Sequence, residues 1–265
     1  MLHNEHSDVK VSIVTVVYNA VGKIEPTLQS VLGQKYSNIE YIVIDGCSTD
    51  GTMEVINRYR NRIDVVISEK DNGIYDALNK GILKATGDWI GIMNAGDVFV
   101  DENVLSKVFR DDRNLEGVDV IYGNAVSVDG NVEVLCKASE NIAELKKGPC
   151  YRHGASFVKR NVHLRYMFDL SKSRQLEFAL DYEQIFRMYK GGCRFTKVNL
   201  PVIKYEMRGA STVSPFKCTY YNYLITHDMK CGILRRLHLG WQTLYRGVAI
   251  VMKRFFVRIF KNDCI

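Results

Sequence analysis

The chain has 265 residues, of which 46% are hydrophobic and 25% are charged. This composition is typical of a globular protein and excludes a disordered or collagen-like chain, and the length suits one large α/β domain or two small ones. The net charge of +6 is regional, because no Asp or Glu lies between Met229 and Asn262 whereas eight Lys and Arg do. A general nucleic-acid-binding protein is therefore not favoured.

The cysteines and apolar runs bear on the cellular compartment. The seven cysteines form no C-x-x-C pair, which argues against a disulfide framework or a structural zinc site and favours a reducing compartment. The polar N-terminus lacks the apolar segment of a secretory signal. The longest apolar run near the C-terminus, residues 248–252, is too short to span a bilayer. We therefore expect a cytoplasmic protein.

The first half of the chain alternates between predicted strands and helices. Four apolar runs predict buried strands, at residues 11–17, 41–45, 64–68 and 89–93. Helical patterns follow the first strand and cover residues 52–59 and 75–85. This alternation predicts an α/β fold with a mainly parallel central sheet flanked by helices. Ligands bind beyond the carboxyl ends of such strands, so we expect the polar residues there, including Thr15, Tyr18 and Asn19, to share one crevice.

The second half has a different pattern. Residues 118–123 and 131–135 predict two strands around the turn Asp129-Gly130, which indicates more antiparallel pairing. A helix is expected at residues 180–189, where Gly191 and Gly192 end it.

Asp97 follows the fourth predicted strand directly, in the segment Met93-Asn94-Ala95-Gly96-Asp97. A carboxylate in this position is suited to coordinate Mg²⁺ or Mn²⁺ bridging a diphosphate. The alternative is a turn carboxylate that caps the next helix, and position alone does not decide between the two. Asp45 and Asp50 bracket a turn after the second strand, where they are suited to bind a base and ribose, but Asp50 also fits a helix cap.

Several enzyme classes lack their motifs here. The chain has no G-x-G-x-x-G after the first strand and no G-x-x-x-x-G-K-[ST], which disfavours a NAD-dependent dehydrogenase and a P-loop ATPase. The absence of G-x-S-x-G disfavours a Ser-His-Asp hydrolase.

Five segments occur in an order that resembles glycosyltransferase family 2: VSIVTVVYNA, VIDGCSTDGT, DNGIYDALNKG, GDWIGIMNAGD and LDYEQIFRMYKGG. The resemblance covers residues 10–212 and implies an inverting enzyme of the GT-A (Rossmann-like) fold. The form of the third and fourth segments is most similar to bacterial transferases that build O-antigen, capsule or exopolysaccharide repeat units.

The resemblance also implies roles for individual residues. Nucleotide or donor binding falls to Thr15, Tyr18, Asn19, Asp45, Asp71, Asp76, Asn79 and Lys80, with Arg208 in a loop over the diphosphate. Asp97 matches the metal-binding Asp of a D-x-D-type motif, although Asn94 stands where its first acidic residue often lies. The implied cofactor is a divalent cation, Mn²⁺ or Mg²⁺.

Catalysis and acceptor binding are assigned to the second half. Asp181 matches the catalytic base, because displacement at the anomeric carbon needs a carboxylate to accept the proton of the attacking hydroxyl. Glu183 is the second candidate for the base, since it lies two residues further along a helix and its side chain points in another direction. His153 matches a recurrent His on the acceptor side, either as a substrate contact or as a structural hydrogen-bonding group.

The C-terminal region, residues 213–265, is predicted to be helical and amphipathic. On a helical projection from Arg235, the Lys and Arg residues share one face and apolar residues such as Trp241 and Phe255 share the other. This pattern favours peripheral attachment to an anionic membrane surface. Packing on the domain or in a homo-oligomer is the alternative.

The sequence thus predicts a transferase domain at residues 1–212, with a nucleotide-sugar half at about 10–112 and an acceptor half at about 113–212. We expect a metal-dependent glycosyltransferase of hexosyltransferase type, using a UDP-sugar and a lipid-linked oligosaccharide acceptor at the inner face of the cell membrane. Such a role belongs to lipopolysaccharide, O-antigen or other polysaccharide biosynthesis. The alternatives are a sugar-1-phosphate nucleotidyltransferase and a non-catalytic nucleotide-binding scaffold at the membrane.

Overall fold

The computed structural model describes residues 9–110, 114–206 and 215–229. Its strands are β1 (Val11–Val17), β2 (Ile39–Asp45), β3 (Val65–Ser68), β4 (Trp89–Asn94), β5 (Val98–Phe99), β6 (Val120–Asp129), β7 (Val132–Cys136), β8 (Ser156–Lys159) and β9 (Phe195–Glu206). Its α-helices are α1 (Val21–Leu32), α2 (Thr52–Arg58), α3 (Ile74–Lys84), α4 (Val104–Val108), α5 (Arg160–Arg165), α6 (Ser173–Leu176), α7 (Leu180–Lys190) and α9 (Pro215–Thr226). Short 3₁₀ helices are η1 (Arg60–Arg62), η2 (Ile142–Lys146), η3 (His153–Ala155), η4 (Leu170–Lys172) and η5 (Glu177–Ala179).

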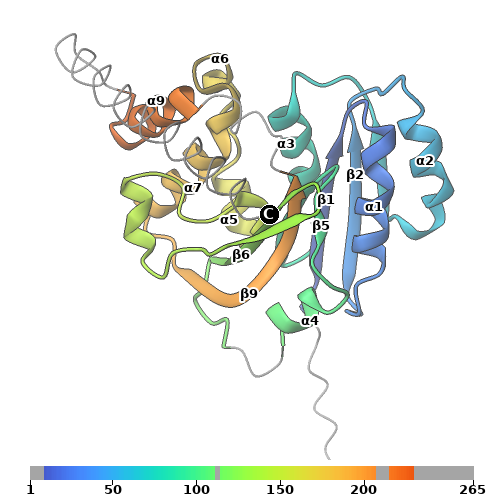
Figure 1. Cartoon of the computed structure of the whole chain (residues 1–265), viewed down its shortest axis with the longest axis horizontal. Coiled ribbons are helices and arrows are strands. Elements are labelled where there is room, and N and C mark those ends of the chain that lie inside the picture. Colours follow the sequence, from blue (N-terminus) through green and yellow to red (C-terminus); the bar gives the residue numbers. More distant parts are fainter. Residues whose placement is uncertain (1–8, 111–113, 207–214, 230–265) are drawn as a thin grey trace, which may run out of the picture.

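The strands of the described residues form one sheet in the order β3-β2-β1-β4-β8-β6-β9-β5, with β7 paired to β6. Strands β3, β2, β1 and β4 run parallel, which confirms the predicted parallel first half. Strand β8 is antiparallel to β4 and β6, whereas β6 and β9 run parallel to each other. The second half is therefore mixed, and Figure 1 shows β6 and β9 curving away from the first four strands.

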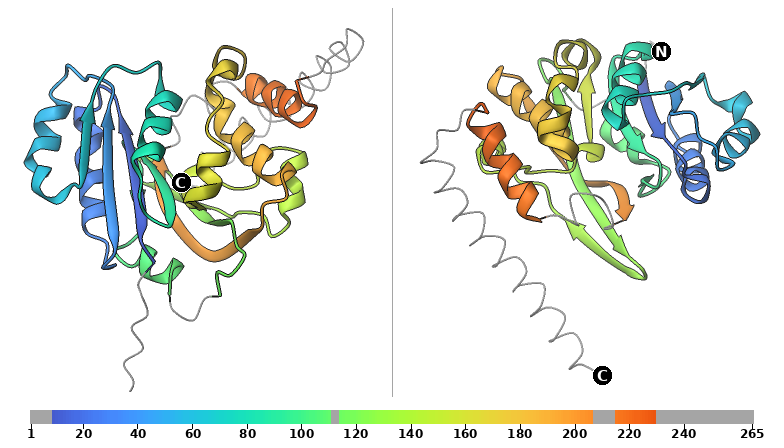
Figure 2. Two further views of the ribbon diagram at one scale, coloured as in Figure 1. Left: turned by 180° about the vertical axis from the view of Figure 1, so that it is seen from behind. Right: turned by 90° about the horizontal axis from the view of Figure 1, so that it is seen from above.

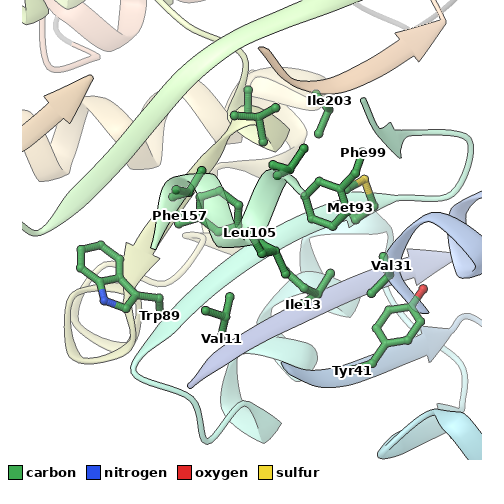
Figure 3. Close-up of a cluster of buried hydrophobic side chains, with 14 of the residues drawn as sticks. Val11, Ile13, Val31, Tyr41, Trp89, Met93, Phe99, Leu105, Phe157 and Ile203 are labelled. Carbon is green, nitrogen blue, oxygen red and sulfur yellow. The ribbon is translucent and has the colours of Figure 1, made fainter. Parts of the chain in front are cut away.

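Helices cover both faces of the parallel half because its strands are apolar on both sides. In β1, Ile13 and Val17 face a cluster that includes α1 and α2, whereas Val14 and Val16 face a cluster with α3. Figure 3 shows the first cluster, in which Ile13, Tyr41 and residues from β4, α4, β8 and β9 pack together. A fully covered parallel sheet leaves the carboxyl ends of its strands as the open edge.

Strand β9 was not predicted from the sequence, and Pro201 explains why. A proline cannot donate to a sheet hydrogen bond, so it argues against a central strand. In the structure Pro201 lies opposite Asn124, where the register of β6 and β9 shifts. Gly123 permits the close approach there, because a Cβ at this position would lie 2.7 Å from the Val202 side chain and 2.8 Å from the Leu200 carbonyl oxygen. The irregularity accommodates the missing donor.

Glu40 joins β1, β2 and the turn before β4. Burial acts to raise the pKa of its carboxyl, but hydrogen bonds from Ser12, Thr86 and Lys10 outweigh burial and lower the pKa to about 2. A depressed pKa stabilises the fold above the unfolded pKa near 4.5, and this stabilisation is lost as the pH falls toward 2. The shift corresponds to ~3 kcal/mol at neutral pH.

We expect Glu40→Gln to lower the free energy of unfolding by about 3 kcal/mol at pH 7 in urea titrations, and by progressively less below pH 4.5. Glu102→Gln is the matched control, because its ion pair with Lys35 is more than half exposed on both sides and such pairs contribute little. A Glu40→Gln effect that stayed constant from pH 7 to pH 3 would contradict the ionic origin of this stabilisation.

Candidate functional site

The carboxyl ends of β1, β2 and β4 meet at one edge of the sheet. Val17 at the end of β1 pairs with Asp45 of β2, and Val16 pairs with Asn94 of β4. The amide of Ala95, the first residue after β4, donates to the carbonyl of Val16 at 3.2 Å. The loops after these strands therefore begin side by side, but Thr15, Tyr18 and Asn19 are not among the residues that line the cavity described next.

A cavity of about 730 Å³ lies between this edge and the second half of the chain. Asn94 and Asp97 line it from the end of β4 and the turn that follows. His153, the first residue of η3, and Arg152, the residue before it, also line the cavity. Asp181 lines it from the first turn of α7. The cavity thus brings together the residue predicted to hold a metal and the residue predicted to act as the base.

Thr27 of α1 fixes the turn that carries Asp97. Its hydroxyl accepts from the amide of Gly96 at 2.9 Å and donates to the carbonyl of Asp97 at 2.8 Å. Gly96 adopts a φ of 100°, which favours glycine. The Asp97 amide donates to the Asn94 carbonyl at 2.9 Å. These backbone bonds hold the turn and leave the carboxylate to face the cavity.

The Asp97 carboxylate is only partly compensated by the protein. Burial raises its pKa to about 6, and Arg152, Asn94 and Lys23 act against this rise. The Asn94 amide group approaches the carboxylate at 3.5 Å, a long hydrogen bond. The other atom of that amide, Asn94 Oδ1, is buried without a hydrogen-bond partner. A partly buried carboxylate beside a buried, unpartnered amide oxygen fits a divalent cation that prefers oxygen ligands.

Further protein ligands are few. Within the described ranges no group of three or more His, Cys, Asp or Glu side chains is arranged to hold a metal ion. A cation at Asp97 and Asn94 needs further oxygen ligands, and substrate phosphates and water supply these in many Mg²⁺ sites. The pair fits a cation that binds together with a diphosphate.

Asp181 lies at the start of α7, where its Oδ1 accepts from the Tyr182 amide at 2.7 Å. Two neighbouring groups are affected by its negative charge. Burial raises the pKa of Tyr75 well above its usual range, and the charge of Asp181 adds to this rise. Burial lowers the pKa of His153, and the same charge opposes that effect. The His153 ring lies edge-on to the Phe168 ring at 5.7 Å between centroids.

Glu183 has a different environment. Its side chain is 5% exposed and accepts from Lys172 and Arg187, the latter at 2.9 Å to both oxygens. It is not among the residues that line the cavity. The structure therefore places Asp181 in the cavity and Glu183 in a buried ion-pair cluster.

The residues predicted to bind the nucleotide lie around the loop after β2. Asp45 accepts from the Ser68 hydroxyl at 2.6 Å and from the Ser48 amide at 3.1 Å. Asn19, with a φ of 45°, donates its amide to the Ser48 hydroxyl at 2.8 Å, so it links the ends of β1 and β2. Tyr18 is 64% exposed beside this loop.

Gly46 keeps space open between Tyr18 and Asp71. A Cβ there would lie 2.5 Å from Asp71 Oδ2 and 3.3 Å from Tyr18 Cδ2. Asp71 also accepts from the Gly73 amide at 2.8 Å, and Asn72 and Gly73 line the cavity. One predicted base-binding residue, Tyr18, and one predicted donor-lining residue, Asp71, are therefore close neighbours at the strand ends.

Other predicted residues make contacts within the protein. Thr15 is fully buried, and its hydroxyl lies 3.1 Å from that of Tyr41. Asp76 accepts from the Asn72 amide at 2.9 Å, and Lys80 pairs with Glu69 at 2.9 Å.

Asn79 and Asp50 each fix a local conformation. Asn79 donates to the Phe168 carbonyl at 2.9 Å and accepts from the Phe168 amide at 3.0 Å. Asp50 accepts from the amides of Val21 and Thr52, each at 3.0 Å, and so joins the first residues of α1 and α2, although the N-cap position of α2 itself is Gly51. Arg208 lies outside the described residues.

Among the cavity residues that were not predicted from the sequence are Tyr75, Arg152 and Asn222. Tyr75 directly precedes Asp76, and Arg152 directly precedes His153. Both could therefore have been predicted as neighbours of predicted site residues. The Arg152 guanidinium lies 4.0 Å from the centroid of the Tyr205 ring. Asn222 lies in α9, whose apolar residues show no clear one-sided periodicity, and it had no signal in the sequence.

The comparison with protein families identifies the first part of the chain. A model described as glycosyl transferase family 2 matches residues 12–166. TuaG from Bacillus subtilis, which is named as a teichuronic acid biosynthesis glycosyltransferase, is 39% identical over 90 residues, or 33% of this chain and 36% of TuaG. The matched segments span less than half the length of the curated relatives.

Solved structures extend the similarity to the whole fold. S. aureus TarS in complex with UDP-GlcNAc superposes with a TM-score of 0.63 at 18% identity, covering 87% of this chain and 69% of TarS. The mannosyltransferase PcManGT from Pyrobaculum calidifontis, in complex with GDP-Man and Mn²⁺, gives 0.64 at 16% identity, covering 90% and 70%. At such low identity the likeness concerns the fold, which is the predicted GT-A fold.

Proposed function

Since the chain belongs to glycosyl transferase family 2, we propose that it is an inverting glycosyltransferase that moves a sugar from a UDP-sugar to an acceptor hydroxyl. One observation carries the proposal. Asp97 after β4 and Asp181 on α7, which lie far apart in the sequence, line the same cavity. Direct displacement needs this pairing, because the leaving diphosphate and the attacking hydroxyl lie on opposite sides of the anomeric carbon.

Each side chain has a chemical role in this scheme. Asp181 accepts the proton of the acceptor hydroxyl as it attacks. Asp97 and Asn94 hold a divalent cation, Mn²⁺ or Mg²⁺, which offsets the negative charge on the leaving diphosphate when it is bound. Arg152, whose charge already acts on Asp97, faces the same phosphate groups. Tyr18, Asn19, Asp45 and the loop after β2 hold the nucleoside.

Similar proteins support the choice of substrates. TarS binds UDP-GlcNAc, PcManGT binds GDP-Man with Mn²⁺, and TuaG is named for teichuronic acid biosynthesis. We propose that this chain acts in the synthesis of a cell-surface polysaccharide, such as an O-antigen, capsule or exopolysaccharide, with a lipid-linked oligosaccharide as acceptor.

The test uses the full-length protein with radiolabelled UDP-sugars, GDP-Man as a comparison, Mn²⁺, and bacterial membranes as the source of acceptor. We expect UDP release together with label in a lipid-extractable product. Nucleotide binding with neither release nor labelled product would contradict the transferase proposal.

The structure describes only part of the C-terminal region that was predicted to bind a membrane, residues 215–229. Helix α9 packs on the domain through Tyr221, Leu224 and Ile225, which are at most 5% exposed. Residues 230–265 lie outside the described residues. Among the helices that the structure does describe, none combines the length and the apolar character needed to cross a bilayer. We propose that residues 230–265, rather than all of 213–265, bind the membrane surface.

We expect reversal of three charges, Lys253→Glu, Arg254→Glu and Arg258→Glu, to weaken co-sedimentation with anionic vesicles by at least about 100-fold, since each basic residue contributes about 1 kcal/mol near such a surface and each Glu is repelled by it. The matched control reverses Lys84, Lys146 and Lys147, which are exposed on the domain and change the net charge equally. Equal weakening by both triple variants would refute a membrane-binding role for this region.

A further inference from the structure

Helix α9 presents two faces to the domain. Tyr221, Leu224 and Ile225 join the second hydrophobic cluster, which also contains residues of α7. Cys218 and Asn222, one helical turn apart, line the cavity that contains Asp97 and Asp181. The helix therefore forms part of the cavity wall in addition to packing on the domain.

Helix α9 contacts the segment that directly precedes Asp181 in the chain. Lys217 donates to both carboxylate oxygens of Glu177 at 2.9 Å, and Tyr221 contacts the Phe178 ring edge-on at 5.4 Å between centroids. Glu177 lines the cavity and has a φ of 45°, a conformation that costs energy for a non-glycine residue and is often found at functional sites. Because η5 continues directly into α7, the position of α9 is coupled to that of Asp181.

The surroundings of Asn222 suit a carbohydrate. Its amide group approaches the backbone at Gly148, where a Cβ would lie 3.1 Å from Asn222 Nδ2. The aromatic residues Tyr75 and Phe178, which are both half-buried, line the same cavity. Aromatic rings offer apolar faces, and a carboxamide both donates and accepts hydrogen bonds. This combination matches a pyranose, which has apolar C–H faces and a rim of hydroxyl groups.

Helix α9 lies far from the strand ends where we propose that the nucleotide binds. Figures 1 and 2 show α9 and α2 at opposite ends of the molecule in every view, with the strand ends of β1 and β2 on the side of α2. The family match ends at residue 166, so α7 and α9 lie beyond it. Contacts from α9 therefore reach the part of the cavity that the predicted nucleotide residues do not occupy.

We propose that α9 forms the wall of the acceptor subsite and that Asn222 hydrogen-bonds a hydroxyl of the saccharide unit that receives the transferred sugar. Asn222 is then a specificity-determining residue that orients this unit toward Asp181. The inference rests on the proposed function, because it assigns the acceptor side of the same cavity.

The test measures two kinds of binding by the full-length protein. Calorimetry with UDP and Mn²⁺ reports on the donor site, and an immobilised panel of hexoses, N-acetylhexosamines, deoxyhexoses and their oligosaccharides, probed in the presence of UDP and Mn²⁺, reports on the acceptor subsite. We expect Asn222→Ala to lower the affinity for the saccharides that wild type binds by about tenfold, with UDP affinity unchanged. Phe216→Ala, on the exposed part of α9, is the control and keeps both affinities.

A second variant, Cys218→Phe, tests the same wall of the cavity independently of Asn222→Ala. Cys218→Phe adds bulk to the same wall one turn earlier and is expected to reduce saccharide binding while UDP binding persists. Unchanged saccharide binding by both variants overturns the inference. A wild-type protein that binds UDP but no saccharide of the panel also overturns it and leaves the donor site intact, whereas a failure to bind UDP counts against the proposed function itself.

Discussion

Replacing Asp97 with Asn is expected to lower Mn²⁺-dependent UDP release by at least about 100-fold, the usual effect of removing a group that stabilises charge in the transition state. The physical reason is the small number of protein ligands. Asp97 supplies the carboxylate of the proposed site and Asn94 an amide oxygen. The variant therefore loses the charged ligand, and the cation loses the interaction that fixes it beside the diphosphate.

The measurement is a Mn²⁺ titration by electron paramagnetic resonance, with and without UDP. Wild type is expected to bind Mn²⁺ weakly alone and more tightly with UDP, because phosphate oxygens complete the coordination. Asn94→Asp is the informative control. It adds a second carboxylate beside Asp97 and is expected to tighten Mn²⁺ binding in the absence of UDP. If Asp97→Asn bound Mn²⁺ and released UDP as wild type does, the metal assignment would be wrong.

Replacing Asp181 with Asn is expected to reduce transfer by about 1000-fold, within the range for loss of a general base. UDP affinity should stay within a factor of two, because the residues proposed to hold the nucleoside, Tyr18, Asn19 and Asp45, lie at the ends of β1 and β2 whereas Asp181 lies on α7. Transfer to acceptor and UDP binding by calorimetry are measured on the same preparation.

Glu183→Gln provides the comparison two residues away. Glu183 is a buried carboxylate that pairs with both Lys172 and Arg187, so its loss removes the negative charge that these two cations share and should lower the free energy of unfolding by about 2 kcal/mol. Transfer per folded molecule should stay close to wild type. The reverse outcome, with Glu183→Gln inactive and Asp181→Asn active, would exchange the two roles.

Much of the first half could be predicted because its signals are local. Continuous apolar strands alternate with helices, and this pattern fixes a parallel sheet whose strand ends share one edge. Asp45 and Asn94 lie at that edge because the registers of β1, β2 and β4 place them beside Val17 and Val16. The family resemblance added Asp181, which no local pattern could bring into the same cavity as Asp97.

The features that the sequence did not predict depend on contacts between segments that are distant in the chain. Thr15 lies in a predicted ligand-binding motif, yet its hydroxyl pairs with Tyr41 inside the sheet. Strand β9 was obscured by Pro201, whose missing donor is accommodated only by the register shift opposite Asn124. The place of Asn222 in the cavity depends on how α9 packs against α7, which the sequence of α9 alone does not encode.

The paired hydrogen bonds between Asn79 and Phe168 restrict how the cavity can open. They link α3, in the first half of the chain, to the backbone between α5 and α7, in the second half. A hinge motion that separated the two halves would break both bonds, at a cost of about 1 kcal/mol each, and would move Phe168 away from His153. Together the two bonds disfavour separation of the two walls by about 2 kcal/mol, so we expect the arrangement seen here to dominate and a separated one to be populated at about 3%.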